Sequence, residues 1–105
     1  MSAELYIKFK NSKWLKTNKK EIEYQISSLE TFVKNTNEEF WLTGIESKEN
    51  PYFDVRLFLN YENYIFLEIT FHPFSIEQSL KIFLSWLRSK TDIFIEDEDG
   101  EPSNW

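Results

Sequence analysis

The chain has 105 residues, a formal net charge of −6 and a pI of about 4.8, with no cysteine, one histidine and two glycines. This length fits one domain over 1–105, and 41% apolar with 18% aromatic residues is enough material for a hydrophobic core. The composition excludes disulfides, zinc–thiolate sites, cysteine nucleophiles, two-histidine metal motifs and glycine-rich phosphate loops.

The N-terminal third of the chain predicts a strand followed by a helix. Apolar and polar residues alternate over 5–10, which is the period of a β-strand, and a polar loop follows. Asn18 and Glu21 have the spacing of a helix N-cap and the acid that completes a capping box, so we expect a helix over 19–34. The apolar face of this helix consists of Ile22, Ile26, Leu29 and Val33.

Three strands are predicted in the middle of the chain. They cover about 39–46, 52–60 and 64–72. The loop between the first two contains 47–51, and the loop between the last two is the short turn 61–63.

A second helix and a short last strand are predicted after Pro73. Ser75 and Gln78 have the spacing of another capping box, ahead of an apolar helical stripe over 76–89. Isoleucines within 93–95 mark the last strand. The order β-α-β-β-β-α-β predicts an α+β two-layer sandwich, in which a mainly antiparallel sheet of about five strands carries two helices on one face.

The hairpin formed by the second and third of the middle strands defines its own register. A three-residue loop keeps the apolar residues of both strands on one face, since a slip of one residue would send them to opposite faces. The pairs expected on that face are Val55 with Ile69 and Leu57 with Leu67. The pairs expected on the other face are Asp54 with Thr70, Arg56 with Glu68 and Phe58 with Phe66.

The strand over 39–46 is placed beside this hairpin by pairing Glu46 with Tyr52. That register turns Trp41, Thr43 and Ile45 toward the helices and sets Phe40 beside Phe58 and Leu42 beside Arg56. We therefore expect an exposed apolar patch on the face without helices, of the kind that marks interaction sites. Its members are Phe40, Leu42, Phe58, Tyr64 and Phe66.

Candidate catalytic residues are few. His72 stands at a strand end without a nucleophile and an orienting partner that can be placed beside it, so we interpret it as a loop histidine. Paired carboxylates need a substrate cleft, and a small two-layer domain without long loops offers little of one. Asp97 and Asp99 have the alternating spacing of a calcium loop but lack its later glutamate. We predict no enzyme, no cofactor and no metal.

The segment 96–105 is acidic and ends in Trp105. We interpret it as a surface that attracts a basic partner, with Trp105 as an anchor, because charge accelerates association and aromatic residues concentrate binding energy. The alternatives are a solvated acidic tail and a tryptophan folded back onto the domain's own core. The predicted partner-binding residues are Glu96, Asp97, Glu98, Asp99, Glu101, Trp105, Phe40, Phe58, Tyr64 and Phe66.

Lysines dominate residues 1–20, and lysines together with sheet aromatics are also typical of nucleic-acid binding. Two observations disfavour this function. The molecule as a whole repels phosphate at its acidic pI. The ribonucleoprotein sequence motif requires a glycine near the sheet aromatics, and this sequence has none there.

The acidic, cysteine-free single domain resembles the small bacterial immunity proteins of contact-dependent and polymorphic toxin systems. The resemblance implies an inhibitor that binds a basic toxin domain, expected to be a nuclease, with Glu96, Asp97, Glu98 and Asp99 meeting its lysines and arginines. The alternative is a homodimer built on the aromatic patch, and the third candidate is a sheet-face nucleic-acid binder. Without a signal core or an apolar run of about 20 residues, we expect a cytoplasmic protein with no membrane partner.

Overall fold

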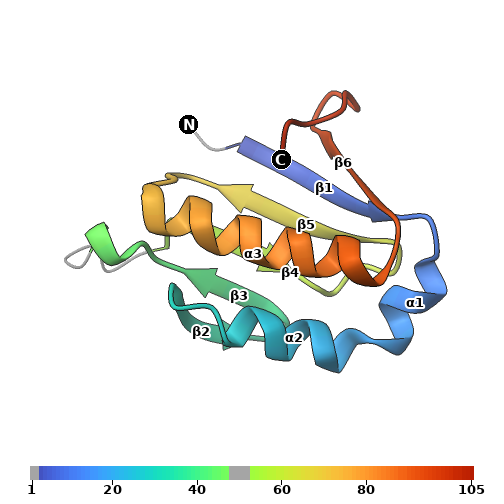
Figure 1. Ribbon diagram of the computed structural model, residues 1–105, viewed down its shortest axis with the longest axis horizontal. Coiled ribbons are helices and arrows are strands. Elements are labelled where there is room, and N and C mark those ends of the chain that lie inside the picture. The colour runs from blue at the N-terminus through green and yellow to red at the C-terminus, as the bar shows by residue number, and fades with distance from the viewer. Residues whose placement is uncertain (1–2, 48–52) are drawn as a thin grey trace.

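The strands of the chain assemble into one antiparallel sheet with helices on one of its faces (Figure 1). The computed structural model describes residues 3–47 and 53–105, and within them six strands follow the order β2-β3-β4-β5-β1-β6 across the sheet. The strands are β1 (Ala3–Phe9), β2 (Phe32–Thr36), β3 (Glu39–Leu42), β4 (Val55–Phe58), β5 (Tyr64–Ile69) and β6 (Ile93–Asp97). The helices are α1 (Ser12–Thr17), α2 (Lys19–Ser27) and α3 (Phe74–Lys90), and η1 (Ile45–Ser47) is a short 3-10 turn. The predicted α+β class is confirmed, with one more strand and one more helix than expected.

The hydrophobic core lies between the sheet and the two longer helices, α2 and α3. Every second residue of the inner strands points into it and is buried, because the side chains of a strand alternate between the faces of a sheet. Burial of each large apolar side chain stabilises the fold by roughly 1.5–3 kcal/mol. The largest fully buried side chains are Phe40, Phe83, Ile7, Ile22, Ile26, Leu42, Leu57, Ile65, Leu67, Ile76, Leu80 and Leu84.

The central hairpin of β4 and β5 has the predicted register. Val55 lies opposite Ile69 and Leu57 opposite Leu67 on the buried face. On the other face Arg56 pairs with Glu68 and Phe58 with Phe66, and the amide of Thr70 donates to the carbonyl of Asp54.

The predicted register of the strand before this hairpin is wrong by one residue. Phe40 lies opposite Leu57 rather than beside Phe58, and Trp41 lies opposite Arg56. Phe40 and Leu42 are therefore fully buried, and Trp41 points away from the helices. The strand ends at Leu42 and the chain turns into η1, so the assumed continuation through 43–46 does not exist; its presumed partner, Tyr52, lies outside the described residues.

The predicted helix over 19–34 is too long. It ends at Ser27, and the chain reverses and continues as β2, which is the unforeseen sixth strand. Asn37 and Glu38 join β2 to β3 with φ of 49° and 67°, the left-handed values of a two-residue type I′ turn, which suits the twist of a hairpin. Val33 is more than half exposed in β2, so its helical spacing from Leu29 was coincidental.

Residues expected to form a polar loop instead form α1, and Asn18 separates it from α2. Asn18 occupies the predicted N-cap position, but its side chain makes no cap bond to α2. The side-chain Nδ2 of Asn18 instead donates to the carbonyl of Trp14 at 2.9 Å. The capping box with Glu21 is therefore absent. Asn18 instead closes the end of the short helix before it.

The start of α3 is capped by a residue distant in sequence. Pro73 holds the N-cap position, and Ser75 lies inside the helix rather than capping it. The Ser75 amide donates to Glu46 Oε2 at 3.1 Å, its hydroxyl donates to Glu46 Oε1, and the same hydroxyl accepts from the Ile45 amide at 3.0 Å. The bond from the Ser75 hydroxyl, and after it bonds from the backbone of Glu46 and of Ser75, hold the pKa of Glu46 below its ordinary value. A carboxylate from η1 thus satisfies the amide end of α3.

The two edges of the sheet differ. The register shifts between Phe32 and Lys34 on β2, which marks a bulge in this edge strand. At the other edge the chain after β6 folds back, forming a bridge between Glu96 and Pro102 and a hydrogen bond from the Ser103 amide to the Ile95 carbonyl.

The register of β3 is testable by stability. We expect Phe40→Ala to lower the free energy of unfolding by about 3–5 kcal/mol, because it empties a fully buried position. Trp41→Ala should cost less, since that side chain is partly exposed. Urea unfolding followed by circular dichroism measures both; the opposite ranking would contradict the register.

Glu46→Gln tests the cap of α3. Because the folded pKa is lowered from 4.5, the stabilisation by the carboxylate is complete above that pH and is lost as pH falls through the folded pKa. We expect the variant to be less stable than wild type at pH 7, with the difference shrinking toward acid pH. Glu30→Gln, at an exposed position, is the matched control, and a difference that does not change with pH would contradict the capping role.

Candidate functional site

The face of the sheet opposite the helices, the open face, carries side chains aligned from strand to strand. In its central row Phe58, Phe66 and Tyr6 are neighbours on β4, β5 and β1. Glu39 precedes them on β3, and Glu96 follows them on β6. Among the described residues no helix crosses this face (Figure 1), so the row meets solvent on its outer side.

Two further rows flank the central one. The row nearer the β4–β5 turn contains Tyr64, Lys8 and Phe94. The row on the other side contains Lys34, Trp41, Arg56, Glu68 and Glu4. Lys34 and Arg56 thus lie on the β2–β4 half of the open face together with Glu39, and Glu68, Glu4 and Glu96 lie on its β5–β1–β6 half together with Lys8.

Five rings at the centre of the open face form a continuous cluster, the ring array. Tyr61 stacks on Tyr64 at 4.7 Å between centroids, and Tyr64 stacks on Tyr6 at 5.5 Å. Phe66 meets Tyr6 edge-on at 5.3 Å, and it contacts Phe58 at 5.4 Å with the two rings tilted by 45°. Such pairs contribute about 0.5–1.5 kcal/mol each beyond their buried area, so the rings are held in place before any partner arrives.

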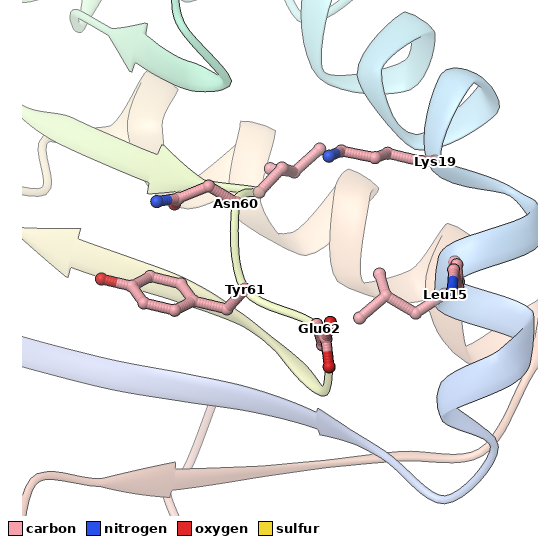
Figure 2. A pocket seen from close by; sticks show the side chains of 7 residues that line it. Leu15, Lys19, Asn60, Tyr61 and Glu62 are labelled. Carbon is pink, nitrogen blue, oxygen red and sulfur yellow. The ribbon is translucent and has the colours of Figure 1, made fainter.

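The ring array ends at a small cavity between α1 and the β4–β5 turn (Figure 2). Its volume is about 170 Å³. In Figure 2 the Tyr61 ring extends along the sheet, while Leu15 and Glu62 face each other across the cavity. The lining residues are Leu15, Lys16, Lys19, Leu59, Asn60, Tyr61 and Glu62.

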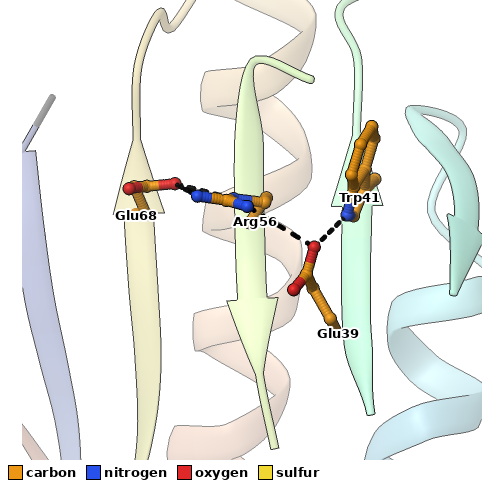
Figure 3. Close-up of polar contacts among 4 residues, drawn as sticks. All are labelled: Glu39, Trp41, Arg56 and Glu68. Atoms are coloured by element: carbon orange, nitrogen blue, oxygen red, sulfur yellow. Dashed lines mark hydrogen bonds and ion pairs between the residues drawn. The ribbon is translucent and has the colours of Figure 1, made fainter. Parts of the chain in front are cut away.

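Arg56 joins three strands of the open face (Figure 3). Its Nε and Nη2 donate to Glu68 Oε1 at 2.7 and 2.6 Å, and its Nη1 lies 3.5 Å from Glu39 Oε2. The same Glu39 oxygen accepts from Trp41 Nε1 at 2.5 Å. The guanidinium also lies 4.1 Å from the Phe53 ring centroid. Arg56 is therefore engaged on all sides and serves to order this half of the face.

The acidic segment is folded rather than extended. Glu96 forms an ion pair with Lys8 at 2.5 Å, and the Asp97 carboxylate accepts the amides of Asp99 and Glu101, each at 2.9 Å. Asp97 thus shapes a turn through its Oδ1 atom. The exposed acids that remain, without an ion pair to any described residue, are Glu98, Asp99 and Glu101.

Trp105 packs against the core of its own domain. Its carbonyl accepts from Arg88 Nη2 at 2.7 Å, and its ring meets that of His72 edge-on at 6.0 Å. This arrangement favours the alternative in which the tryptophan folds back.

The structure brings some predicted partner-binding residues together and separates others. Phe58, Tyr64 and Phe66 meet in the ring array, whereas Phe40 lies in the core on the opposite side of the sheet. Sequence reasoning missed Tyr6 and Tyr61. Tyr6 was detectable, because it alternates with the buried Leu5 and Ile7; Tyr61 sits in a turn, where no period applies.

The other chemical candidates assemble no site. His72 Nδ1 lies 2.8 Å from Glu77 Oε2 on the surface, and the His72 ring contacts the Trp105 ring. No group of three or more histidine, cysteine, aspartate or glutamate residues within 3–47 and 53–105 is placed to hold a metal ion.

Comparison of the chain with protein-family models, with curated proteins and with solved structures gives no match. In the part of the chain that the structure describes, no helix is long and apolar enough to cross a membrane.

The ring array predicts an unusual tyrosine titration. Partial burial, and then the neighbouring Tyr61 and Tyr6, raise the pKa of Tyr64 above 10, against the opposing effect of Lys8. Folding favours the neutral form of the Tyr64 phenol. The contribution of this neutral phenol to the stability of the folded protein is therefore present below pH 10 and is lost as pH rises through the folded pKa. We expect Tyr64→Phe to remove a phenolate absorbance step that the wild-type protein shows above pH 10; a variant that keeps the whole wild-type titration would contradict the assignment.

Proposed function

We propose that the protein binds a basic protein partner through the open face and acts as a stoichiometric inhibitor, an immunity protein that neutralises a toxin domain in the bacterial cytoplasm. The observation that carries the proposal is the ring array, which is partly exposed at the centre of the face, together with the exposed acids Glu98, Asp99 and Glu101 that follow β6. Protein interfaces commonly join an aromatic centre to a charged, wet rim. No catalytic step and no cofactor form part of this function.

The acids of the chain have two different roles in this proposal. Glu39 and Glu68 share the ion pairs of Arg56, and Glu96 pairs with Lys8, so these acids order the face. The exposed acids of the C-terminal turn, Glu98, Asp99 and Glu101, keep their charge and give the β6 side its negative field. Such a field raises association rates with a basic partner by roughly 10–1000-fold and falls with salt.

The arrangement of charge supports a protein partner over a nucleic acid. Lys8 on the open face is paired with Glu96, and Arg56 with two glutamates. The cations nearest the ring array are therefore not available for phosphates, which supply most of the affinity for nucleic acids.

The candidate partner is the basic domain of a secreted toxin encoded beside this gene. Light scattering after size exclusion should show a 1:1 complex, and Phe66→Asp should weaken it by at least about 30-fold, since a buried hot-spot residue contributes 2 kcal/mol or more. Phe94→Asp, at a more exposed position on the same face, should also weaken it.

Replacing Glu98, Asp99 and Glu101 together by lysine should slow association of the complex and flatten the salt dependence of the association rate.

Lys81→Asp provides the matched control, because it places the same aspartate on an exposed position of α3, away from the open face. Each variant is first checked for native circular dichroism. Unchanged affinity of folded Phe66→Asp and Phe94→Asp would remove the open face from the interface. A dimeric mass for the protein alone, abolished by Phe66→Asp, would instead support the homodimer.

A further inference from the structure

The cavity at the end of the ring array has an apolar floor and a balanced rim. Leu15 and Leu59, which are only 4% and 3% exposed, form the apolar part of its lining. On the rim, Lys19 of α2 forms an ion pair with Glu38 of the β2–β3 turn. Lys16 and Glu62, also on the rim, carry opposite charges. A neutral rim over an apolar floor suits an uncharged occupant.

The volume of the cavity limits what it can hold. Pockets for drug-sized ligands measure roughly 300–1,000 Å³, well above the 170 Å³ found here. An apolar cavity of about 150 Å³ is known to hold benzene. The space therefore matches one ring or one branched aliphatic side chain rather than a metabolite or cofactor.

The cavity is continuous with the ring array, because Tyr61 belongs to both. It lines the cavity and also stacks on Tyr64 and meets Phe66 edge-on. We infer that the partner inserts one uncharged apolar side chain, the size of phenylalanine or leucine, into this cavity while its neighbouring residues cover the ring array. This inference rests on the proposed function and names the anchor of the same interface.

The test uses the full chain and the probe N-acetyl-phenylalanine amide, with N-acetyl-alanine amide as the negative control. Isotope-labelled methyl signals of Leu15 and Leu59 should shift saturably with the phenylalanine probe and not with the alanine probe. Asn60→Trp places a large ring at the exposed rim and should weaken both the probe and the toxin-domain complex about ten-fold or more. Asn63→Trp adds the same ring at an exposed position of the same turn outside the lining, and should leave both affinities nearly unchanged.

The outcomes separate this inference from the proposed function. Absence of saturable shifts, or shifts that persist in Asn60→Trp, would overturn the cavity as a binding site. If Phe66→Asp disrupts the complex while Asn60→Trp does not, the open face stands as the interface and the anchor is refuted. If the probe saturates but Phe66→Asp leaves the complex intact, the proposed interface fails and the inferred occupant fails with it.

Discussion

The structure depends on the unequal covering of the two faces of its six-stranded sheet: the described helices cover one face only. The covered face is stabilised by burial of aliphatic side chains between strands and helices. Within residues 3–47 and 53–105 no second layer covers the other face, so its residues are ordered by one another, through stacked rings and the ion pairs of Arg56. This makes the open face rigid and still accessible, which is the combination that a binding surface needs.

The central hairpin was predictable because its two strands carry complementary patterns on both faces. Aliphatic pairs on one side and the Arg56–Glu68 and Phe58–Phe66 pairs on the other agree on a single register. β3 lacked such a check. It is four residues long, and its register was inferred from a pairing beyond its real end, so Phe40 and Trp41 exchanged faces.

The helical end and the acidic segment show a different limit of sequence patterns. Apolar spacing continued through Leu29 to Val33 although the chain had already left the helix, and tertiary pairing with β3 decided that the later residues form a strand. In the C-terminal segment, charge alone did not distinguish the acids that shape the backbone from those that stay exposed. Asp97 accepts two backbone amides and shapes its turn, while Glu98 and Glu101 in the same run point to solvent. Such differences depend on local backbone geometry, which composition does not encode.

The treatment of the two sheet edges has a consequence for behaviour at high concentration. A sheet with unpaired edges is prone to add strands from other molecules. In the fibrils that result, the rings of the open face would be buried between stacked sheets. Here the returning chain at Pro102 and Ser103 occupies part of the β6 edge, and the bulge at Phe32 and Lys34 distorts the β2 edge. Lateral polymerisation through either edge is thereby discouraged.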